Sequence, residues 1–498
     1  MNRIGRRIYH FFSSRLFFGI VLGFFVFEAL WFVFSAVYPM AFDEDFHFGL
    51  IKLYSHYWLP FFGHQPPDAD QFGAVFRDPS YLYHYLMSFP YRFIALFVHS
   101  ETMQVISLRL LNVAMFTGAL LLYRKLLFGL KASKALAHVA LAIFILIPIV
   151  SQLAAHINYD NLFIVLMPLL CMSAFSLIRG FKKQQVNALA LLAFVILTMI
   201  LALVKYPGLP IILAAMLFLA VYVTLAFEGR FGRLIRRMVL GFKIANRRVM
   251  ALLVVVLIVV FGLFAQRYGV NLARYHNPVP DCGAVMTVKQ CSAYSPWYRD
   301  YVYTHGKSET FHASPLRYMW LWLWGMWHRL FFAVNGPLSN YTNYDQLPMP
   351  GLVAVLLAAS LGTVLLWWRR IFRGDALAAF CMTVAAGYIT VLWLNGYADY
   401  SRVGEPIAIN GRYLLPVLPL MAVPLGRGIK FSLQRLKIER SKPFLALIAL
   451  LLLLHGGGVF TFILRSDDSW YWPNKTVQKV NNTARKMLAP VTTGGKYR

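Results

Sequence analysis

Apolar stretches long enough to cross a membrane recur along this chain. Hydrophobic residues persist for about 20 positions at a time, the length that crosses roughly 30 Å of hydrocarbon as a helix, and short polar segments separate them. We expect eleven spanning helices, over residues 16–38, 104–126, 135–152, 160–178, 185–203, 207–226, 249–266, 351–368, 376–394, 411–426 and 443–464. The pattern predicts an all-α polytopic membrane protein.

The composition agrees with this pattern and excludes a soluble fold. Hydrophobic residues make up 59% of the 498 positions and charged residues only 14%, and a soluble chain of this length could not bury so much apolar surface in one core. The first apolar stretch, Leu16–Tyr38, follows a basic head but is too long for the core of an ordinary signal peptide. We therefore expect it to remain as the first helix.

The basic residues predict the orientation. The net charge of +28 comes from 48 Lys and Arg against 20 Asp and Glu. With the basic N-terminus in the cytoplasm, every second connection is cytoplasmic, and each of these is rich in Lys or Arg, as the positive-inside rule requires. These basic clusters are Arg124–Lys134, Arg179–Lys183, Arg230–Arg248, Arg369–Arg373 and Arg427–Lys442. We predict a multi-pass protein of a bacterial inner membrane, with no nucleic-acid partner because no basic region carries a nucleic-acid motif.

Two apolar segments are left out of the count. If Tyr81–Val98 spanned the membrane, the Arg124–Lys134 cluster would lie outside. Its four tyrosines suit a helix lying among the lipid headgroups, where aromatic rings are enriched. We expect the same of Trp320–Phe332, so both segments are predicted to be juxtamembrane helices on the periplasmic side.

The predicted spans divide the chain into four regions. Residues 1–266 form an N-terminal transmembrane module whose first outer loop is 39–103; 267–350 form a periplasmic loop, 351–464 the C-terminal transmembrane helices, and 465–498 a periplasmic tail. Two cysteines, Cys282 and Cys291, share the 267–350 loop. In an oxidising compartment we expect them to form a disulfide that closes a small ring, with a pair of metal ligands as the alternative.

Acidic residues gather on the side opposite the basic loops. Sixteen of the 20 Asp and Glu residues fall in predicted outer loops, and the positive-inside rule does not explain this because it concerns Lys and Arg. The densest group is Asp43, Glu44, Asp45 and His47, directly after the first helix. Closely spaced carboxylates raise the pKa of at least one of them, which suits a general base. Loop solvation and a helix N-cap are the alternatives.

Five segments, in this order, carry a resemblance to a known superfamily: Phe42-Asp43-Glu44 with His47-Phe48-Gly49, Asp78-Pro79-Ser80-Tyr81-Leu82-Tyr83-His84-Tyr85, Ile157-Asn158-Tyr159-Asp160-Asn161, Val204-Lys205-Tyr206-Pro207-Gly208 and Asn410-Gly411-Arg412-Tyr413-Leu414-Leu415-Pro416. They resemble the first-loop Asp-Glu motif and four later rim motifs of the GT-C glycosyltransferases, which include protein O-mannosyltransferases and bacterial aminoarabinose transferases. The second segment begins with Asp78 where the family usually has His. The resemblance covers mainly residues 1–210 and the stretch around Arg412, and it implies a GT-C-like fold.

The resemblance also implies a reaction, in which a sugar moves from a polyprenyl-phosphate carrier to an acceptor at the outer face of the membrane. Asp43 would be the general base that takes the proton of the acceptor hydroxyl, and Glu44 would position the acceptor or tune its neighbour. A single base opposite the leaving phosphate implies inversion at the anomeric carbon. The supporting candidates are Asp45, His47 and Asp160, the last of which could instead cap a helix.

Cations at the outer ends of helices are the candidates for the donor phosphate. We expect Arg412 and Lys205 to bind it, with Arg402 and Arg92 in reserve, although such residues can also snorkel to the interface. The candidates for the acceptor groove are Tyr83, His84 and Tyr85, with interfacial anchoring as their alternative. No cofactor is expected, and a divalent metal held by the Asp43–Asp45 carboxylates is not favoured. The sugar stays open, as does the acceptor, whether glycan, lipid or protein.

Two other classes of membrane protein compete with this interpretation. A secondary transporter would keep its charges near mid-membrane and show internal repeats, whereas the acid cluster lies at one rim and the chain shows no convincing repeat. A polysaccharide ligase or polymerase would rely on cations in a large outer loop. The 267–350 loop offers such cations in Arg274, Arg299, Arg317 and Arg329.

Overall fold

The chain folds into a bundle of helices. The computed structural model describes residues 3–40, 43–305, 314–331, 348–407 and 409–493. Within these ranges there is no β-strand, and a single isolated bridge joins Ala36 to Tyr471. The predicted all-α class is therefore confirmed for the part of the chain that the structure describes, whereas Phe42 and Phe332, the latter the end of a predicted juxtamembrane helix, lie outside it.

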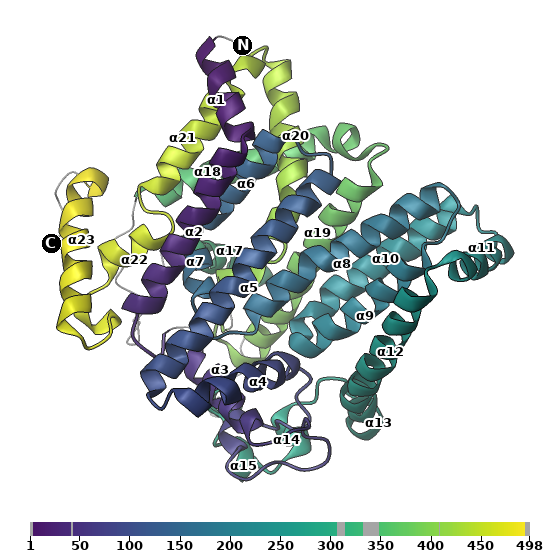
Figure 1. The fold of residues 1–498 in the computed structure, drawn as a ribbon, viewed down its shortest axis with the longest axis vertical. Helices are drawn as coiled ribbons and strands as arrows, with labels where there is room; N and C mark the ends of the chain where they lie inside the picture. Colours follow the sequence, from purple (N-terminus) through teal and green to yellow (C-terminus); the bar gives the residue numbers. More distant parts are fainter. Residues whose placement is uncertain (1–2, 41–42, 306–313, 332–347, 408, 494–498) are drawn as a thin grey trace.

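The first half of the chain supplies most of the helices in the centre of Figure 1. The helices are α1 (Arg3–Ser13), α2 (Arg15–Ser35), α3 (Glu44–Ser55), η1 (Asp70–Phe72), α4 (Leu82–Phe97), α5 (Glu101–Gly129), α6 (Lys134–Ile145), α7 (Pro148–Ala154), α8 (Asp160–Lys182), α9 (Ala188–Val204), η2 (Tyr206–Gly208), α10 (Leu209–Ala226), α11 (Phe231–Ile244) and α12 (Arg247–Phe264). Among them, α5, α8 and α9 pack in succession, and α2 lies against α5.

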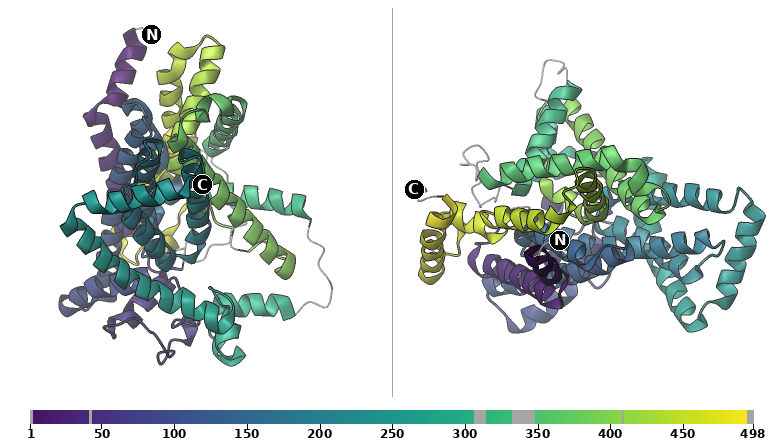
Figure 2. Two further views of the ribbon diagram at one scale, coloured as in Figure 1. Left: turned by 90° about the vertical axis from the view of Figure 1, so that its right-hand side faces the viewer. Right: turned by 90° about the horizontal axis from the view of Figure 1, so that it is seen from above.

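The second half adds shorter helices and four more long ones. These are η3 (Ala265–Gly269), α13 (Val270–Tyr275), α14 (Cys282–Val285), α15 (Val288–Cys291), α16 (Ser295–His305), α17 (Pro315–Phe331), α18 (Pro348–Phe372), α19 (Ala376–Val403), η4 (Gly411–Leu414), α20 (Leu418–Arg435), η5 (Glu439–Ser441), α21 (Lys442–Leu454), α22 (Val459–Arg465), η6 (Asp468–Trp470) and α23 (Lys475–Thr493). Of these, η3 continues α12, which packs against α9 at the edge of the bundle, and Figure 2 gives two further views of this arrangement.

Eight helices in the described ranges are long and apolar enough to cross a membrane. They are Arg15–Ser35, Glu101–Gly129, Asp160–Lys182, Tyr206–Ala226, Arg247–Tyr275, Val355–Phe372, Ala376–Val403 and Glu439–Arg465. The pair α6 and α7 would add a ninth if it forms one span; its halves meet at 77°, where Pro148 interrupts the helix. The structure thus supports a multi-pass membrane protein. The count of eleven stays a prediction, since α9 is shorter and α20 is not among the eight.

Several helices continue beyond the ends that hydrophobicity predicts. The span that starts at Arg247 runs to Tyr275 through the π-helical turn η3, although the loop was expected to begin at Arg267. Likewise α19 reaches Val403, nine residues past its predicted end at 394. Helical hydrogen bonding does not stop where the apolar run stops, because polar residues can extend a helix beyond the hydrocarbon. The loop regions are correspondingly shorter than the sequence indicated.

A buried acid in α2 serves as a structural contact between helices. Glu28 is completely buried, and its Oε1 accepts a hydrogen bond from the backbone N–H of Val459 at 3.0 Å. The chain passes this point at Gly458, where φ is +56° and a Cβ would lie 1.6 Å from Glu28 Oε1. Glycine is therefore required here. The interaction joins α2 to the start of α22, so this intramembrane acid has a packing role.

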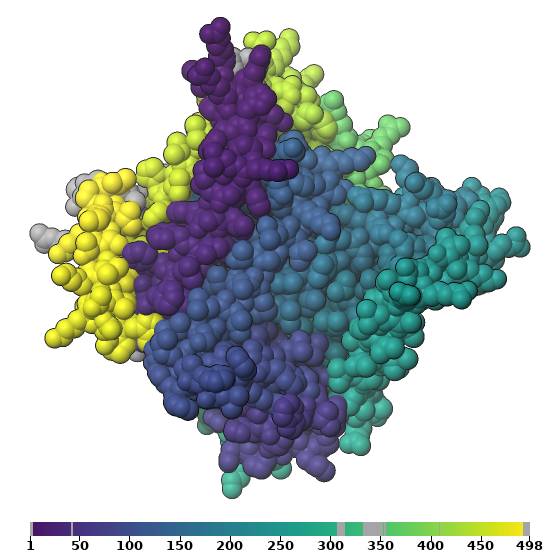
Figure 3. Space-filling view, in the orientation of Figure 1, coloured from purple at the N-terminus to yellow at the C-terminus, as the bar shows by residue number. Residues whose placement is uncertain are grey.

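The alternation of helix direction brings distant segments to one end of the bundle. The helices α2, α9 and α19 finish at this end, whereas α8 and α10 begin there, so the connections between them meet. We call it the Asp43 end. The helices α3 and α4 pack against each other across it, at the bottom of Figure 1, and Figure 3 shows the segment that contains them covering that part of the surface. Neither α4 nor α17, which match the two predicted juxtamembrane segments, is among the candidate spans.

Candidate active site

Asp43 occupies the position before the first residue of α3, yet it does not cap that helix. Its backbone is left-handed, with φ 59°, and its side chain makes no hydrogen bond to the first turn. Asp is one of the few L-residues that adopt this conformation readily. The side chain is 70% exposed. The helix-cap alternative for this residue is therefore not supported, and its carboxylate faces outward.

The next residue, Glu44, points the opposite way into the bundle. It is completely buried, and both of its oxygens meet Arg109 of α5, at 2.8 Å from Nε and 2.7 Å from Nη2. Backbone N–H groups of Met40 and Ile157 donate to the same carboxylate at 2.8 and 3.2 Å. Burial opposes ionisation, but the charge and hydrogen bonds of Arg109 outweigh it and lower the pKa of Glu44. Glu44 is thus a charged structural anchor.

Arg109 completes this pair by binding the end of the preceding helix. Its Nη1 donates to the carbonyl of Ala36 at 2.7 Å and its Nη2 to the carbonyl of Val37 at 3.2 Å, while its guanidinium lies 5.3 Å from the ring centroid of Trp472. A bidentate arginine–carboxylate pair is a rigid arrangement, and here both carboxylate oxygens also accept a backbone hydrogen bond. It holds the first turn of α3 against α2 and α5, and with it the neighbouring Asp43.

Three further charged residues from distant parts of the chain lie behind Asp43. Arg412, in η4, places Nη2 3.5 Å from Asp43 Oδ2 and Nε 3.7 Å from Asp160 Oδ2. Asp160, the first residue of α8, also forms an ion pair with Lys205, which follows α9. The side chains of Lys205, Asp160 and Arg412 are only 3%, 3% and 6% exposed. We call Asp43, Asp160, Lys205 and Arg412 the charge cluster.

Aromatic rings enclose the cations of the charge cluster. Lys205 Nζ lies 4.7 Å from the ring centroids of both Tyr159 and Tyr413, and the Arg412 guanidinium lies 5.3 Å from Tyr413. Ring faces attract cations and exclude water at the same time. Lys205, Arg412 and the Asp160 carboxylate are therefore held together in a poorly hydrated place, where electrostatic interactions are stronger than in water.

A pair of histidines lies beside Asp43. His47 of α3 and His84 of α4 are buried, their Nδ1 and Nε2 atoms are 2.8 Å apart, and their rings stack. Burial lowers the pKa of His84 to about 3. Burial, together with His84, Arg412 and Lys205, lowers the pKa of His47 well below its usual range. Both imidazoles are therefore neutral near pH 7, and one ring donates to the other.

A cavity of about 970 Å³ opens in front of Asp43. Four segments line it: α3, the loop between α3 and α4, Tyr159 directly before α8, and the residues that follow α15. The lining residues used below are Asp43, Asp45, Phe46, His47, Lys52, Asp68, Phe72 and Tyr294. Of the two acids next to each other in the chain, Asp43 thus reaches the cavity, whereas Glu44 does not line it.

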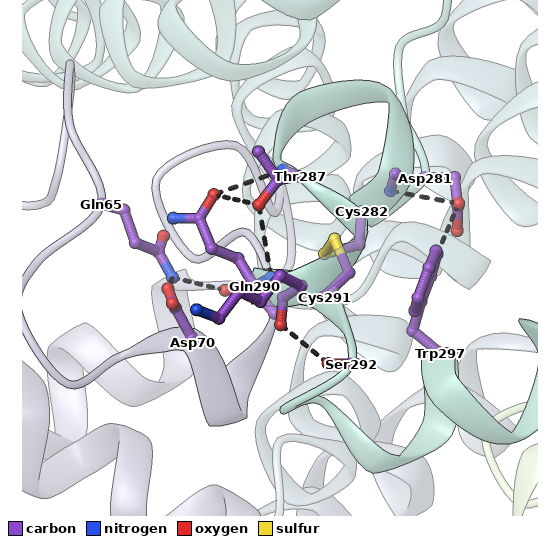
Figure 4. Close-up of a disulfide and its surroundings, with 12 residues drawn as sticks. Gln65, Asp70, Asp281, Cys282, Thr287, Gln290, Cys291, Ser292 and Trp297 are labelled. Carbon is purple, nitrogen blue, oxygen red and sulfur yellow. Dashed lines mark hydrogen bonds between the residues drawn. A yellow bond between two sulfur atoms is a disulfide. The ribbon is translucent and has the colours of Figure 1, made fainter.

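A disulfide shapes one wall of this cavity. Cys282 and Cys291 are joined, and Figure 4 shows the ring they close. The side chain of Thr287 caps α15 in a capping box with Gln290, and Trp297 Nε1 donates to Asp281 at 2.7 Å. The ring lies beside η1, and the segment directly after Cys291 supplies Tyr294 and its neighbours to the cavity. The predicted pairing therefore belongs to the site's architecture.

The other predicted phosphate-binding and acceptor-groove residues make contacts away from the charge cluster. Arg92 donates to the carbonyls of Tyr54 and Ser55 at the far end of α3, which is about 18 Å along the helix from Asp43, and Arg402 pairs with Asp399 of the same helix at 3.6 Å. The buried Tyr83 hydroxyl donates to Asn112, and the Tyr85 hydroxyl to the carbonyl of Trp58. None of Tyr83, His84 and Tyr85 lines the cavity.

Two residues at the site escaped the sequence reasoning. Arg109 was not predicted because it lies within an apolar stretch. An ionisable residue in a spanning helix usually has a partner or a function, and this rule could have identified it. Tyr294 carries no signal that distinguishes it from other loop tyrosines. In the described ranges, no group of three or more His, Cys, Asp or Glu side chains is arranged to hold a metal ion.

Neither a scan of protein-family models nor a search of curated proteins finds a match to this chain.

Proposed function

We propose that the protein is an inverting glycosyltransferase that moves a sugar from a polyprenyl-phosphate carrier to an acceptor hydroxyl. The observation that carries the proposal is the position of Arg412, which lies between an exposed carboxylate at a cavity, Asp43, and a buried ion pair, Asp160–Lys205. A group that takes a proton and groups that bind an anion are thus next to each other. The motifs that resemble those of GT-C enzymes lead to the same reaction.

Asp43 acts as the general base. Its side chain is exposed at the cavity, where an acceptor hydroxyl can approach it. As the hydroxyl oxygen attacks the anomeric carbon, its proton passes to the Asp43 carboxylate, and the bond from that carbon to the phosphate oxygen breaks. The phosphate is already a good leaving group, so no enzyme nucleophile is needed, and attack from the opposite face inverts the configuration.

Arg412 and Lys205 stabilise the departing phosphate. Negative charge grows on the phosphate oxygens as the bond breaks, and cations held in place beforehand lower the barrier without reorganisation. In the absence of donor, Asp160 and Asp43 balance these cations. Arg412 lies 3.5 and 3.7 Å from the two carboxylates, which is ion-pair distance and longer than a charge-assisted hydrogen bond. A phosphate that arrives here can exchange for these two carboxylate contacts.

The location of the charge cluster favours glycosyl transfer over transport. Asp160 begins one candidate span and Lys205 immediately precedes another, so the charges lie at one end of the bundle and not near its middle. The buried acid Glu28 already has a packing partner. We further propose that the Asp43 end faces the periplasm and that the membrane is a bacterial inner membrane, as the basic loops indicate.

The substitution Asp43→Asn tests the proposal. In proteoliposomes supplied with radiolabelled polyprenyl-phosphate sugars and an envelope extract as the source of acceptor, it should lower transfer by about 100- to 10,000-fold, the usual contribution of a general base. Thermal unfolding should not change, because the side chain is exposed.

The matched control is Glu228→Gln, which removes an exposed acid that, like Asp43, has a left-handed backbone, lies outside the cavity and pairs only with Arg230 among the described residues. This variant should transfer as the wild type does. If Asp43→Asn accumulates in the membrane and transfers sugar at the wild-type rate, Asp43 is not the base and the proposed reaction loses its main support.

A further inference from the structure

We propose that the cavity in front of Asp43 binds a carbohydrate chain without negative charge, and that this chain is the acceptor. The role of this chain as the acceptor rests on the proposed function. The binding of the chain to the cavity does not depend on that function. The inference assigns a substrate class to a surface other than the predicted acceptor groove, since none of Tyr83, His84 and Tyr85 lines the cavity.

The size and composition of the cavity suit several linked sugar rings. A volume of about 970 Å³ lies at the upper end of the range for sites that enclose an organic ligand. Its walls combine aromatic rings with carboxylates, so both apolar and polar side chains line it. A sugar ring has the same mixture, with apolar C–H faces and a rim of hydroxyl groups. A purely lipidic ligand would leave the carboxylates unpaired and desolvated.

Three aromatic side chains provide ring faces next to the proposed base. The Phe46 ring lies 5.9 Å from Tyr294, tilted by 34°, and 5.7 Å from Phe72 in an edge contact. They come from α3, η1 and the segment after the disulfide, so the fold assembles this platform from separate parts of the chain. Gly73, with φ +74°, is needed for the approach, because a Cβ there would lie 3.0 Å from the Tyr294 ring.

The charges of the cavity exclude an anionic acceptor. Asp45 and Asp68 line it, and neither forms an ion pair with any described residue, whereas Lys52 is already paired with Glu101 at 3.1 Å. The histidine at its floor, His47, is neutral. Carboxylates only accept hydrogen bonds, so they suit the O–H donors of an uncharged sugar and repel phosphate or uronate groups. This polarity is notable in a chain whose net charge is +28.

Binding of purified full-length protein in lipid nanodiscs to a glycan microarray tests the inference. The array should carry neutral, amino-substituted and acidic glycans, and no sugar donor is added. We expect retention on neutral glycans and little on sulfated, phosphorylated or uronate-containing ones. Tyr294→Ala should weaken retention by about tenfold, which is the size of one aromatic contact. The control is Tyr298→Ala, which alters an exposed tyrosine outside the cavity.

A second variant tests whether the carboxylates of the cavity exclude acidic glycans. The double substitution Asp45→Asn with Asp68→Asn should increase binding of acidic glycans while Asp43 is retained. Preference of the wild type for acidic glycans, absence of binding to any glycan, or binding by Tyr294→Ala equal to that of the wild type would each overturn the inference.

The two proposals fail in different ways. If Asp43-dependent transfer occurs but no neutral glycan binds, the acceptor class is wrong and the reaction stands. If neutral glycans bind through Tyr294 but Asp43→Asn has no effect on transfer, the binding site stands and the reaction is wrong.

Discussion

Asp43 and Glu44 are neighbours in the chain, and the two carboxylates have opposite environments. Glu44 is completely buried, with both oxygens bound by Arg109 and by backbone N–H groups. Asp43 is 70% exposed at a cavity and meets Arg412 only at ion-pair distance. The left-handed backbone at Asp43 allows this divergence, because it gives Asp43 a different backbone conformation from the helical residue Glu44 that follows it.

The comparison teaches that the number of hydrogen bonds a carboxylate already accepts distinguishes a structural acid from one that can take part in a reaction. A buried carboxylate whose lone pairs are all used gains nothing from a substrate and loses much if its partner is removed. A carboxylate held loosely beside a cation can exchange partners when a hydroxyl or a phosphate arrives. The two ion-pair groups should therefore respond differently to substitution, the Glu44–Arg109 pair in stability and the charge cluster in activity.

The largest effect should come from Arg109→Ala. This substitution leaves the Glu44 charge buried without its partner and removes two donors to the carbonyls of Ala36 and Val37. We expect a loss of about 3–5 kcal/mol in the free energy of unfolding, as is usual when one member of a buried pair is deleted. Denaturation of the protein in mild detergent, followed by tryptophan fluorescence, would measure it.

The control for this prediction is the double variant Glu44→Gln/Arg109→Met, which removes both charges and keeps most of the side-chain volume. It should unfold closer to the wild type than Arg109→Ala does. Wild-type stability of Arg109→Ala would show that the pair is not a structural anchor and would bring Glu44 back as a candidate for the chemistry.

The next effect should be on donor use, from Arg412→Ala. Loss of one fixed cation beside a developing negative charge usually lowers kcat by about 100- to 1000-fold. Stability should change less than in Arg109→Ala, because Asp160 keeps its ion pair with Lys205 and Asp43 is exposed to solvent. Transfer from radiolabelled polyprenyl-phosphate sugar measures the first quantity and thermal unfolding the second. Arg402→Ala is the matched control, since that exposed residue pairs only with Asp399 among the described residues. Equal transfer by both variants would remove Arg412 from the site.

The smallest effect concerns pH and sharpens the contrast between charged acids and neutral histidines at the same site. His84 has a pKa of about 3 in the folded protein because it is buried, against about 6.5 when unfolded. The unfolded chain therefore binds the proton more readily, and stability falls as pH drops below about 6.5, by up to about 1.4 kcal/mol per pH unit for each such histidine. Thermal unfolding between pH 7.5 and 4.5 should show a shallower slope for His84→Gln. An unchanged slope would mean that His84 is already protonated in the folded state.

The sequence by itself determined the class of structure and the end of the bundle at which the charges meet. Hydrophobic runs of about 20 residues specify helices in lipid because backbone groups there must bond within the segment, and each of the eight candidate spans overlaps a predicted one. The order of loops along an antiparallel bundle also placed Asp43, Asp160, Lys205 and Arg412 on one side. That inference needs only the alternation of direction, not any contact.

Only the tertiary structure decided which of these side chains meet and which face a cavity. Periodicity cannot tell that Glu44 turns toward Arg109, 65 positions away, while Asp43 turns outward, because the choice depends on a single backbone conformation and on a partner from another helix. It also cannot tell that Tyr294 stands against Phe46. Such contacts arise from packing between elements far apart in the chain, and packing is settled by the shapes of all the neighbours together.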